Sequence, residues 1–355
     1  MQAGHKRRLG TTNLSITALS MGCASLGGLY TPVSAVDALA TLQAAWDSGI
    51  RYFDVAPMYG LTRAEHLLGQ FLREEPQRDE AVVSTKVGRL FSNDRPGRRL
   101  PPEPPKNPLD PGWQNGLPFR ETFDYSYEGI MRSFDDSQQR MGTDRLDILF
   151  IHDIGVLTHG ERNAALWRQL TSGGFRALSE LREAGLIAGF GLGVNEADAI
   201  AAAMDEVHLD CCLLAGRHSL LEQEAVPLLD RAHRQGTAIV IGGVFNSGIL
   251  ATGSAANAKF NYADAPAEIV RRTEELARVC AAFDVPLGAA AVQFPLFHPA
   301  VVSVLVGAKH PDKLLQSVGW FETDIPDELW QALREKGLLA PTSFLMETEG
   351  LSTAP

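Results

Sequence analysis

The sequence predicts an α/β protein of the (β/α)8-barrel (TIM barrel) class, with an N-terminal hairpin and a long loop after the third strand. Two observations predict this fold. Short apolar, β-branched runs alternate eight times with longer runs of helical period, which fits either a closed barrel or a doubly wound sheet. The turn after the first strand, G-C-A-S-L-G-G at residues 22–28, lacks the G-x-G-x-x-G spacing of a dinucleotide-binding sheet. The barrel is therefore favoured.

The elements follow in order along the chain. Residues 6–17 predict a short polar hairpin with turn residues at 10–13. The barrel strands are near-continuously apolar, as expected for strands buried on both faces, and span residues 18–22, 52–55, 81–87, 146–152, 188–194, 210–215, 238–244 and 301–306. The helices have apolar residues at helical spacing, and several stop at a glycine; they span residues 35–48, 64–73, 127–141, 175–184, 197–207, 224–234, 266–283 and 311–319.

Further segments lie outside the repeat. Residues 89–124 form an insertion rich in Pro and Gly, with Trp113, Phe119 and Phe123 interspersed. A stretch of this length is usually functional or disordered; its aromatic residues favour an ordered cover over a substrate, and a disordered linker stays open. Residues 326–339 predict an additional helix. We therefore expect one catalytic barrel domain over residues 1–340 and a mobile C-terminal tail over residues 341–355.

Composition narrows the class of protein. Apolar residues make up 45% of the chain and the formal net charge is −11, which argues against a nucleic-acid partner. No secretory signal or apolar run long enough for a membrane span is visible, so a cytoplasmic location is expected. The four cysteines form no C-x-x-C pair, which indicates buried reduced thiols and no metal site. A homo-oligomer is left open.

Polar side chains stand at the ends of three consecutive strands of the predicted barrel. Asp54 lies near the end of the second strand, Lys86 at the end of the third and His152 at the end of the fourth, while Tyr59 follows the second strand. Each of these has an ordinary structural explanation when taken alone, such as a turn cap, rim packing, a solvated lysine or a core histidine. Barrel active sites lie at the C-terminal strand ends, so the four together predict a catalytic site.

The four side chains suit proton transfer to or from a substrate oxygen. A carbonyl reduced by hydride needs a proton, and an alcohol being oxidised must lose one. Lys86 could lower the pKa of Tyr59 from its usual value near 10, and Asp54 would be the partner that a buried lysine needs. His152 would orient the substrate oxygen. Without a nucleophile elbow or a metal cluster, hydrolysis and metal chemistry are less favoured.

The motifs that carry these residues resemble the catalytic tetrad of the aldo-keto reductase superfamily. They are F-D-V-A-P-M-Y-G with Asp54 and Tyr59, S-T-K-V-G with Lys86, and F-I-H-D with His152. The resemblance extends from Leu9 to Gly319. It implies a (β/α)8 barrel, an extended nicotinamide cofactor (NAD or NADP) held without a Rossmann domain, and Tyr59 as the general acid/base.

The same resemblance implies cofactor contacts. Asn195, which ends G-L-G-V-N, would hold the carboxamide. In the loop G-G-V-F-N-S-G-I-L, four residues would wrap the pyrophosphate through an anion-binding nest of backbone amides: Phe245, Asn246, Ser247 and Gly248. Gly307, Lys309 and Lys313 would meet the adenosine phosphate at the start of the last barrel helix. The two lysines would favour NADP if they bound a 2′-phosphate, and simple solvated side chains are an equally good explanation.

One departure from the family pattern concerns the nicotinamide face. The resemblance implies an aromatic side chain, often tyrosine, that stacks on the nicotinamide at the end of the sixth strand. This sequence has G-R-H-S-L there, and His218 takes the place of the aromatic residue. A histidine ring can also stack, so His218 is the expected contact.

Within the superfamily, L-L-A-G-R-H-S-L-L and G-G-V-F-N-S-G-I-L are most similar to the bacterial aldose dehydrogenases, the group of L-fucose, D-threo-aldose and L-galactose dehydrogenases. The resemblance implies oxidation of an aldose at C1 to the lactone, with hydride passing to NAD(P)+. A pyridoxal 4-dehydrogenase and a general NADPH-dependent aldehyde or ketone reductase stay open. So do a nicotinamide-binding regulatory subunit and an unrelated barrel lyase or hydrolase.

Overall fold

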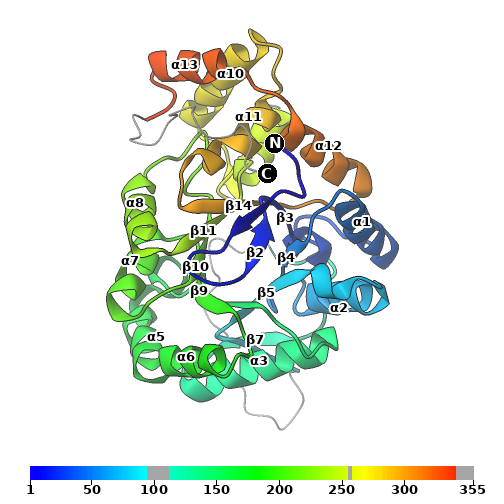
Figure 1. The fold of residues 1–355 in the computed structure, drawn as a ribbon, viewed down its shortest axis with the longest axis vertical. Coiled ribbons are helices and arrows are strands. Elements are labelled where there is room, and N and C mark those ends of the chain that lie inside the picture. Colours follow the sequence, from blue (N-terminus) through cyan, green and yellow to red (C-terminus); the bar gives the residue numbers. More distant parts are fainter. Residues whose placement is uncertain (94–111, 255–257, 341–355) are drawn as a thin grey trace.

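Eight parallel strands form a closed barrel in the computed structural model, which describes residues 1–93, 112–254 and 258–340 (Figure 1). The strands follow one another around the barrel in chain order, and β14 pairs with β3 to close it. They are β3 (Leu19–Gly22), β4 (Tyr52–Asp54), β5 (Val82–Val87), β8 (Ile148–His152), β9 (Gly189–Val194), β10 (Cys211–Ala215), β11 (Ala238–Gly242) and β14 (Val301–Val306). The predicted fold class is confirmed.

The apolar pattern of the strands follows from burial on both faces. In β8, Ile148 and Phe150 belong to the apolar cluster inside the barrel. Leu149 and Ile151 belong to the larger cluster between the strands and the surrounding helices. Successive side chains of a strand point to opposite faces, so every position of such a strand has an apolar neighbourhood.

A hairpin closes the N-terminal end of the barrel. Strands β1 (Lys6–Arg8) and β2 (Ser15–Thr17) pair antiparallel, as predicted, and the hairpin lies across the strands in Figure 1. Leu9 and Ile16 are buried in the interior cluster, and Arg7 Nη1 donates to the carbonyl oxygen of Val301 at 3.2 Å. Because this end is plugged, the opening of the barrel is at the C-terminal ends of the strands.

Helices surround the barrel (Figure 1). Those that follow the barrel strands are α1 (Ala35–Asp47), α2 (Arg63–Glu74), α3 (Tyr127–Met141), α6 (Phe175–Glu183), α7 (Ala197–Glu206), α8 (Val226–Gln235), α10 (Ala267–Ala281) and α12 (Pro311–Glu322). Their ends have local causes. Ser34 and Ser126 cap α1 and α3 by accepting a backbone N–H bond. Gly142 and Gly236 end α3 and α8 in the left-handed conformation.

Several short elements were not predicted. Between β8 and α6 lie α4 (Val156–His159), α5 (Asn163–Gln169) and a π-helical turn (Leu170–Gly174) that continues into α6. Between α10 and β14 lies α11 (Leu287–Gln293), whose residues from Gly288 to Gln293 are all buried. A helix buried all round has no polar face, so its sequence lacks the amphipathic period. The additional helix predicted near the end is present as α13 (Asp327–Glu335).

The ends of the 89–124 insertion are ordered as a hairpin rather than a loop. Strands β6 (Arg89–Ser92) and β7 (Arg120–Phe123) pair antiparallel. The rest of the predicted cover, residues 94–111, and the predicted tail, residues 341–355, lie outside the described residues.

Within the described ranges, none of the helices has the length and apolar character that a bilayer span requires. All four cysteines are buried and free, as predicted.

Candidate active site

Asp54 and Lys86 form a buried ion pair at the open end of the barrel. Each side chain is 2% exposed, and Lys86 Nζ donates to Asp54 Oδ2 at 2.7 Å. Lys86 also donates to the carbonyl oxygen of Val55 at 2.9 Å, and Ser84 Oγ donates to Asp54 Oδ1 at 2.7 Å. These bonds offset the cost of burying both charges. The structure thus brings together the lysine and carboxylate that the sequence pairs.

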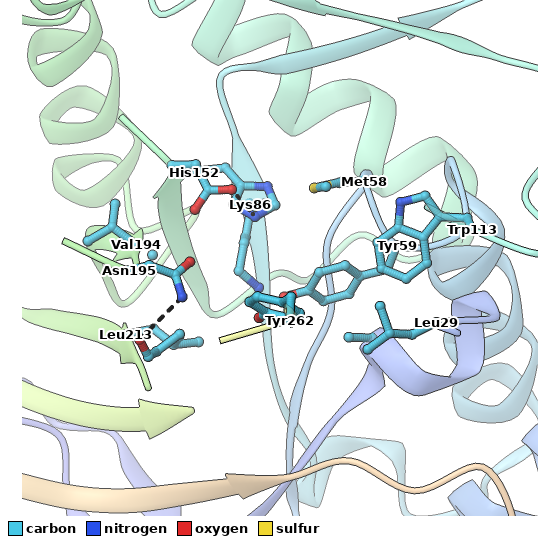
Figure 2. Close-up of a pocket in the computed structure, with 14 residues that line it drawn as sticks. Leu29, Met58, Tyr59, Lys86, Trp113, His152, Val194, Asn195, Leu213 and Tyr262 are labelled. Carbon is cyan, nitrogen blue, oxygen red and sulfur yellow. Dashed lines mark hydrogen bonds and ion pairs between the residues drawn. The ribbon is translucent and has the colours of Figure 1, made fainter. Parts of the chain in front are cut away.

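Tyr59 and His152 face the same pocket as Lys86. Their rings lie edge to face with centroids 6.1 Å apart, and Lys86 Nζ is 4.8 Å from the centroid of the Tyr59 ring. Figure 2 shows the Tyr59 ring reaching toward the end of the Lys86 side chain. All three line one pocket at the strand ends, with Asp54 buried behind Lys86. A substrate oxygen in this pocket would lie within reach of a phenol, an imidazole and an ammonium group.

A tight turn after β4 presents Tyr59 to the pocket. The Tyr59 carbonyl accepts from Ala64 N at 3.1 Å, and three residues after Tyr59 have positive φ: Gly60, Leu61 and Thr62. A Cβ atom on Gly27 would come within 2.5 Å of Gly60 N, so the turn packs directly against the loop after β3. Left-handed leucine and threonine are uncommon and cost free energy. The turn is therefore held by its surroundings and not by local preference alone.

The electrostatics of Tyr59 differ from the expectation. Burial first, and then the Asp54 carboxylate, hold the pKa of Tyr59 well above its usual value. These effects outweigh the lowering that was expected from Lys86, whose ammonium is paired with Asp54 at 2.7 Å. Tyr59 is thus set up as a proton donor. Positive charge brought into the pocket would lower the pKa of Tyr59 and favour its phenolate.

The surroundings of His152 keep its imidazole ring neutral. Burial lowers its pKa well below the usual 6.5, and the positive charges of Arg89 and Lys86 lower it further. The Tyr125 hydroxyl donates to the backbone carbonyl of His152 at 2.6 Å and fixes the strand end. A neutral imidazole can still donate one hydrogen bond. His152 is therefore suited to orienting a substrate oxygen and not to supplying a positive charge.

The buried histidines predict a loss of stability in weak acid. Burial lowers the pKa of His159 and of His218 to about 3, and lowers that of His152 well below 6.5. Below pH 6.5 these histidines become protonated in the unfolded chain but stay neutral in the folded chain. The free energy of unfolding therefore decreases as the pH falls. Each histidine contributes up to about 1.4 kcal/mol per pH unit. The raised pKa values of Asp54 and Asp153 act in the opposite sense nearer pH 4.

Urea unfolding at pH 7.5, 6.5 and 5.5 checks this expectation. The slope between pH 6.5 and 5.5 should correspond to about two or three protons taken up on unfolding. His218 packs against the Phe294 ring, with centroids 5.2 Å apart. In the variant His218→Phe, the number of protons taken up on unfolding should be lower by about one. A free energy of unfolding that stays constant from pH 7.5 to 5.5 would contradict the neutral state of these histidines.

Several pocket residues were missed by the sequence analysis or given no role there. The walls of the pocket include Leu29, Met58, Trp113, Asp153 and Tyr262. The ring centroids of Trp113 and Tyr59 are 5.7 Å apart (Figure 2). Tyr262 lies in the turn between β12 (Lys259–Phe260) and β13 (Ala263–Asp264). The aromatic content of the insertion was a signal for Trp113, but the segment F-N-Y-A-D gave none for Tyr262.

Trp113 is held over the pocket by backbone pairing. It forms an isolated antiparallel bridge with Leu29. The next residues continue the attachment, because Gln114 N donates to Gly28 O and Leu117 N donates to Gly60 O, both at 3.0 Å. The described end of the insertion is thus bound to the loop after β3 and to the Tyr59 turn. The described end of the insertion therefore lies beside the pocket, and the role of the insertion as a cover stays a prediction.

Asn195 fits the predicted contact with a nicotinamide carboxamide. It follows β9 and lines the pocket beside Val194 (Figure 2). Its Nδ2 donates to the carbonyl oxygen of Ala215 at 3.3 Å, and Arg217 Nε donates to the backbone oxygen of Asn195 at 2.8 Å. The side-chain amide is therefore fixed at the wall of the pocket that Tyr59, Lys86 and His152 share. Such an amide can bond both the oxygen and the nitrogen of a carboxamide.

The loop predicted to bind pyrophosphate is tightly turned, and its amides are partly used. Asn246, Ser247 and Gly248 all have positive φ. Asn246 N donates to Gly243 O at 2.8 Å and Gly248 N donates to Phe245 O at 2.9 Å. The Asn246 side chain is buried and bonds Ser219 and Glu222. These two amides therefore do not form the predicted nest in this conformation, since they close the turn instead.

The adenosine end of the predicted cofactor site is more open. Gly307 and Lys313 are exposed, the latter in the first turn of α12. Lys309 Nζ folds back onto the loop after β3, where it donates to the carbonyl oxygen of Leu29 and, at 2.5 Å, to Thr31 Oγ1. Lys309 is thus already hydrogen-bonded within the chain. This arrangement favours the interpretation of Lys309 as a structural residue over that of a phosphate ligand.

His218 lies in the core and not against the pocket. It is 2% exposed, and its ring packs on Phe294 at 5.2 Å and edge to face with His298 at 6.3 Å. Its predicted contact with the nicotinamide does not fit this packing. Tyr262 is the aromatic side chain that the structure places in the pocket near Asn195 (Figure 2).

Known proteins similar to the chain have the same fold and carry related names. The family model described as Aldo/keto reductase family matches residues 18–337. Pyridoxal 4-dehydrogenase of Microbacterium luteolum is 60% identical over 96% of this chain and 99% of that protein. D-threo-aldose 1-dehydrogenase of Pseudomonas sp is 40% identical over 92% and 95%. The solved aldo-keto reductase AKR11C1 of Bacillus halodurans aligns with a TM-score of 0.70 at 20% identity, over 97% and 98% of the two chains, and so has the same fold.

Proposed function

Because the chain belongs to the aldo/keto reductase family, we propose that it oxidises the cyclic hemiacetal of pyridoxal to the lactone. The chain is an NAD(P)-dependent oxidoreductase of that family. The observation that carries the choice of substrate is the 60% identity to pyridoxal 4-dehydrogenase over nearly the full length of both chains. When bound, the oxidised nicotinamide would supply the hydride acceptor and a positive charge, and Asn195 would hold its carboxamide.

The residues of the chain would handle the proton that hemiacetal oxidation releases. Tyr59 would accept it from the hemiacetal hydroxyl, since its phenol faces the pocket beside Lys86. The raised pKa of Tyr59 means that the phenolate needs positive charge close by. Lys86 and the charge of the oxidised cofactor would provide it together. Neutral His152 would donate a hydrogen bond to the same substrate oxygen and hold it in line with Tyr59.

The walls of the pocket suit a flat aromatic substrate. Trp113, Tyr59 and Tyr262 contribute aromatic rings, and Leu29 and Met58 contribute apolar surface. A pyridine ring gains stacking and burial energy from such walls. The same pocket also presents polar groups, namely those of Lys86, His152, Asp153 and Asn195. Aromatic walls together with polar groups fit a heteroaromatic hemiacetal.

An aldose is the second candidate, and one observation favours it. D-threo-aldose 1-dehydrogenase is 40% identical over 92% of the chain. A cyclic sugar presents the same reacting group, a hemiacetal carbon with a hydroxyl, to Tyr59. The oxidation of the sugar at C1 predicted from the sequence therefore uses the same chemistry, and the two candidates differ only in the ring that the pocket must hold.

We infer that NAD+ is preferred over NADP+. Lys309 is engaged by Leu29 and Thr31, and Asp312 adds a carboxylate to the first turn of α12. A carboxylate there disfavours an additional phosphate group. Lys313 is the remaining cation of the two lysines predicted to favour NADP, and a single exposed lysine contributes little binding energy.

Absorbance at 340 nm tests the proposed function. The protein is offered pyridoxal, L-fucose, D-arabinose and L-galactose with NAD+ or NADP+ at mildly alkaline pH. We expect pyridoxal with NAD+ to give a kcat/KM at least about tenfold above every sugar and above NADP+, equivalent to about 1.4 kcal/mol of transition-state binding. Faster turnover of a sugar would establish the aldose candidate. NADPH consumption on simple aldehydes with no oxidation of any hemiacetal would show a reductase instead.

A further inference from the structure

A second carboxylate borders the active-site pocket directly after His152. Asp153 lines the pocket, and its side chain is 13% exposed. Its backbone is left-handed, with φ of 47°, and its N–H donates to the carbonyl oxygen of Gly193 at 3.0 Å. A non-glycine residue in this conformation must be held by its surroundings. Asp153 plays no part in the proton transfer assigned to Tyr59, Lys86 and His152.

Arg89 holds the Asp153 carboxylate in place. Its guanidinium is 1% exposed and donates from Nη2 to Asp153 Oδ2. Nη1 of the same group donates to Glu121 Oε2 at 2.9 Å, and the guanidinium carbon lies 4.9 Å from the centroid of the Phe123 ring. Arg89 and Glu121 belong to β6 and β7, the hairpin formed by the ends of the insertion. The carboxylate is therefore held by a buried guanidinium that belongs to the hairpin formed by the ends of the insertion.

The carboxylate has capacity for a ligand. An ionised carboxylate offers about four lone-pair positions, and the bond from Arg89 occupies Oδ2. His152 Nε2 lies 3.5 Å from the same oxygen, so the carboxylate is next to the group that would hold the reacting oxygen. A donor group on the substrate, close to the reacting carbon, would complete the bonding of this buried anion.

We propose that Asp153 is a specificity-determining residue that accepts a hydrogen bond from a ring hydroxyl next to the reacting carbon of the substrate. The proposal deepens the proposed function and rests on it for the choice of a pyridine substrate. It states that the enzyme selects hemiacetals and aldehydes bearing a hydrogen-bond donor near the reacting carbon. Arg89 is the positioning residue that orients the carboxylate.

Three simple aldehydes test this selection through NAD(P)H-dependent reduction. Benzaldehyde carries no donor, pyridine-4-carbaldehyde adds a ring nitrogen that is an acceptor when unprotonated, and 3-hydroxypyridine-4-carbaldehyde adds a hydroxyl next to the aldehyde. We expect the wild type to favour 3-hydroxypyridine-4-carbaldehyde over the other two aldehydes. In Asp153→Asn, kcat/KM for that aldehyde should fall by about 10- to 100-fold, the effect of losing a hydrogen bond to a charged group. For benzaldehyde it should change by less than about threefold.

The control is Asp147→Asn. Asp147 is a buried carboxylate just before β8, at the opposite end of the strand, and it accepts from Arg145 Nε and from Val83 N at 2.8 Å each. This variant should lower thermal stability and leave the ratio between the aldehydes unchanged. If Asp153→Asn is unfolded by circular dichroism, the double variant Asp153→Asn/Arg89→Met removes both buried charges and should show the same loss of selection.

Two results would overturn the proposal. One is an equal loss for all three aldehydes, which would mean that Asp153 only positions His152. The other is an unchanged ratio between them. The wild-type assay with pyridoxal tests the proposed substrate separately. If the selection among the three aldehydes depends on Asp153 but pyridoxal is not oxidised, the role of Asp153 is supported and the proposed substrate is refuted.

Discussion

Replacing Tyr59 with phenylalanine is expected to lower kcat by about 10³-fold, in the range for loss of a general acid/base. The substitution removes one oxygen atom from a group that faces the pocket beside Lys86 and His152. The phenyl ring keeps its packing against Trp113, whose centroid is 5.7 Å away. The pocket should therefore keep its shape and lose the group that accepts or donates the proton.

Two measurements separate chemistry from binding in Tyr59→Phe. Single-turnover kinetics at 340 nm give the rate of the chemical step, and quenching of intrinsic fluorescence gives the dissociation constant of the cofactor. That constant should change by less than about threefold, since a group that acts mainly in the transition state contributes little to ground-state binding. Tyr262→Phe is the matched control, because Tyr262 also lines the pocket and is half-buried; it should retain most of kcat. Full activity of Tyr59→Phe would refute the assignment of the proton to Tyr59.

Replacing Lys86 with methionine is expected to affect both stability and activity. The variant leaves Asp54, itself 2% exposed, as an unpaired buried carboxylate. Breaking a buried ion pair from one side typically costs about 3–5 kcal/mol of unfolding free energy. Activity should also fall by about 10²-fold or more, because the pocket loses the positive charge nearest to Tyr59.

A double variant distinguishes the two effects of Lys86. Asp54→Asn/Lys86→Met has no buried charge at this position, so urea unfolding should show most of the lost stability restored. Activity should stay at the level of Lys86→Met, since the ammonium is still missing. Recovery of activity together with stability would mean that Lys86 serves the fold and not the reaction.

The candidate catalytic side chains were predictable because strand ends can be recognised along the chain. Asp54, Lys86 and His152 each close an apolar run, and strands of a parallel barrel bring their C-terminal ends to one rim. The structure places Lys86 and His152 in one pocket with Tyr59, and Asp54 directly behind Lys86. The resemblance to the aldo-keto reductases, stated on the same motifs, is confirmed by the family match over residues 18–337.

The electrostatic state of these side chains could not be predicted in the same way. The sequence shows that Lys86 and Tyr59 come near each other, and from that proximity a lowered pKa of Tyr59 was expected. The structure shows the opposite direction, because burial of the phenol and the position of Asp54 outweigh the ammonium. The sum of these opposing effects depends on depth and distance, which a one-dimensional pattern does not contain.

The loop predicted to bind the pyrophosphate also has a conformation that the sequence did not predict in full. The order of residues in G-G-V-F-N-S-G-I-L indicates a tight loop, and three successive residues with positive φ form one. Which amides point outward is decided by the turn itself, and Asn246 and Gly248 direct theirs inward. His218 likewise occupies the expected place in the sequence and packs into the core against Phe294.

The barrel and the four candidate catalytic side chains at its rim could be predicted from the sequence, because they depend on local periodicity and on the strand at which a residue stands. The tertiary structure alone decided the walls of the pocket, where Trp113 and Tyr262 come from distant loops and meet the strand ends. It also decided the link from Arg89 to Asp153, which joins residues 64 positions apart. Contacts of that separation form only when the whole chain has folded, since no local pattern records which loops will cross above the same strands.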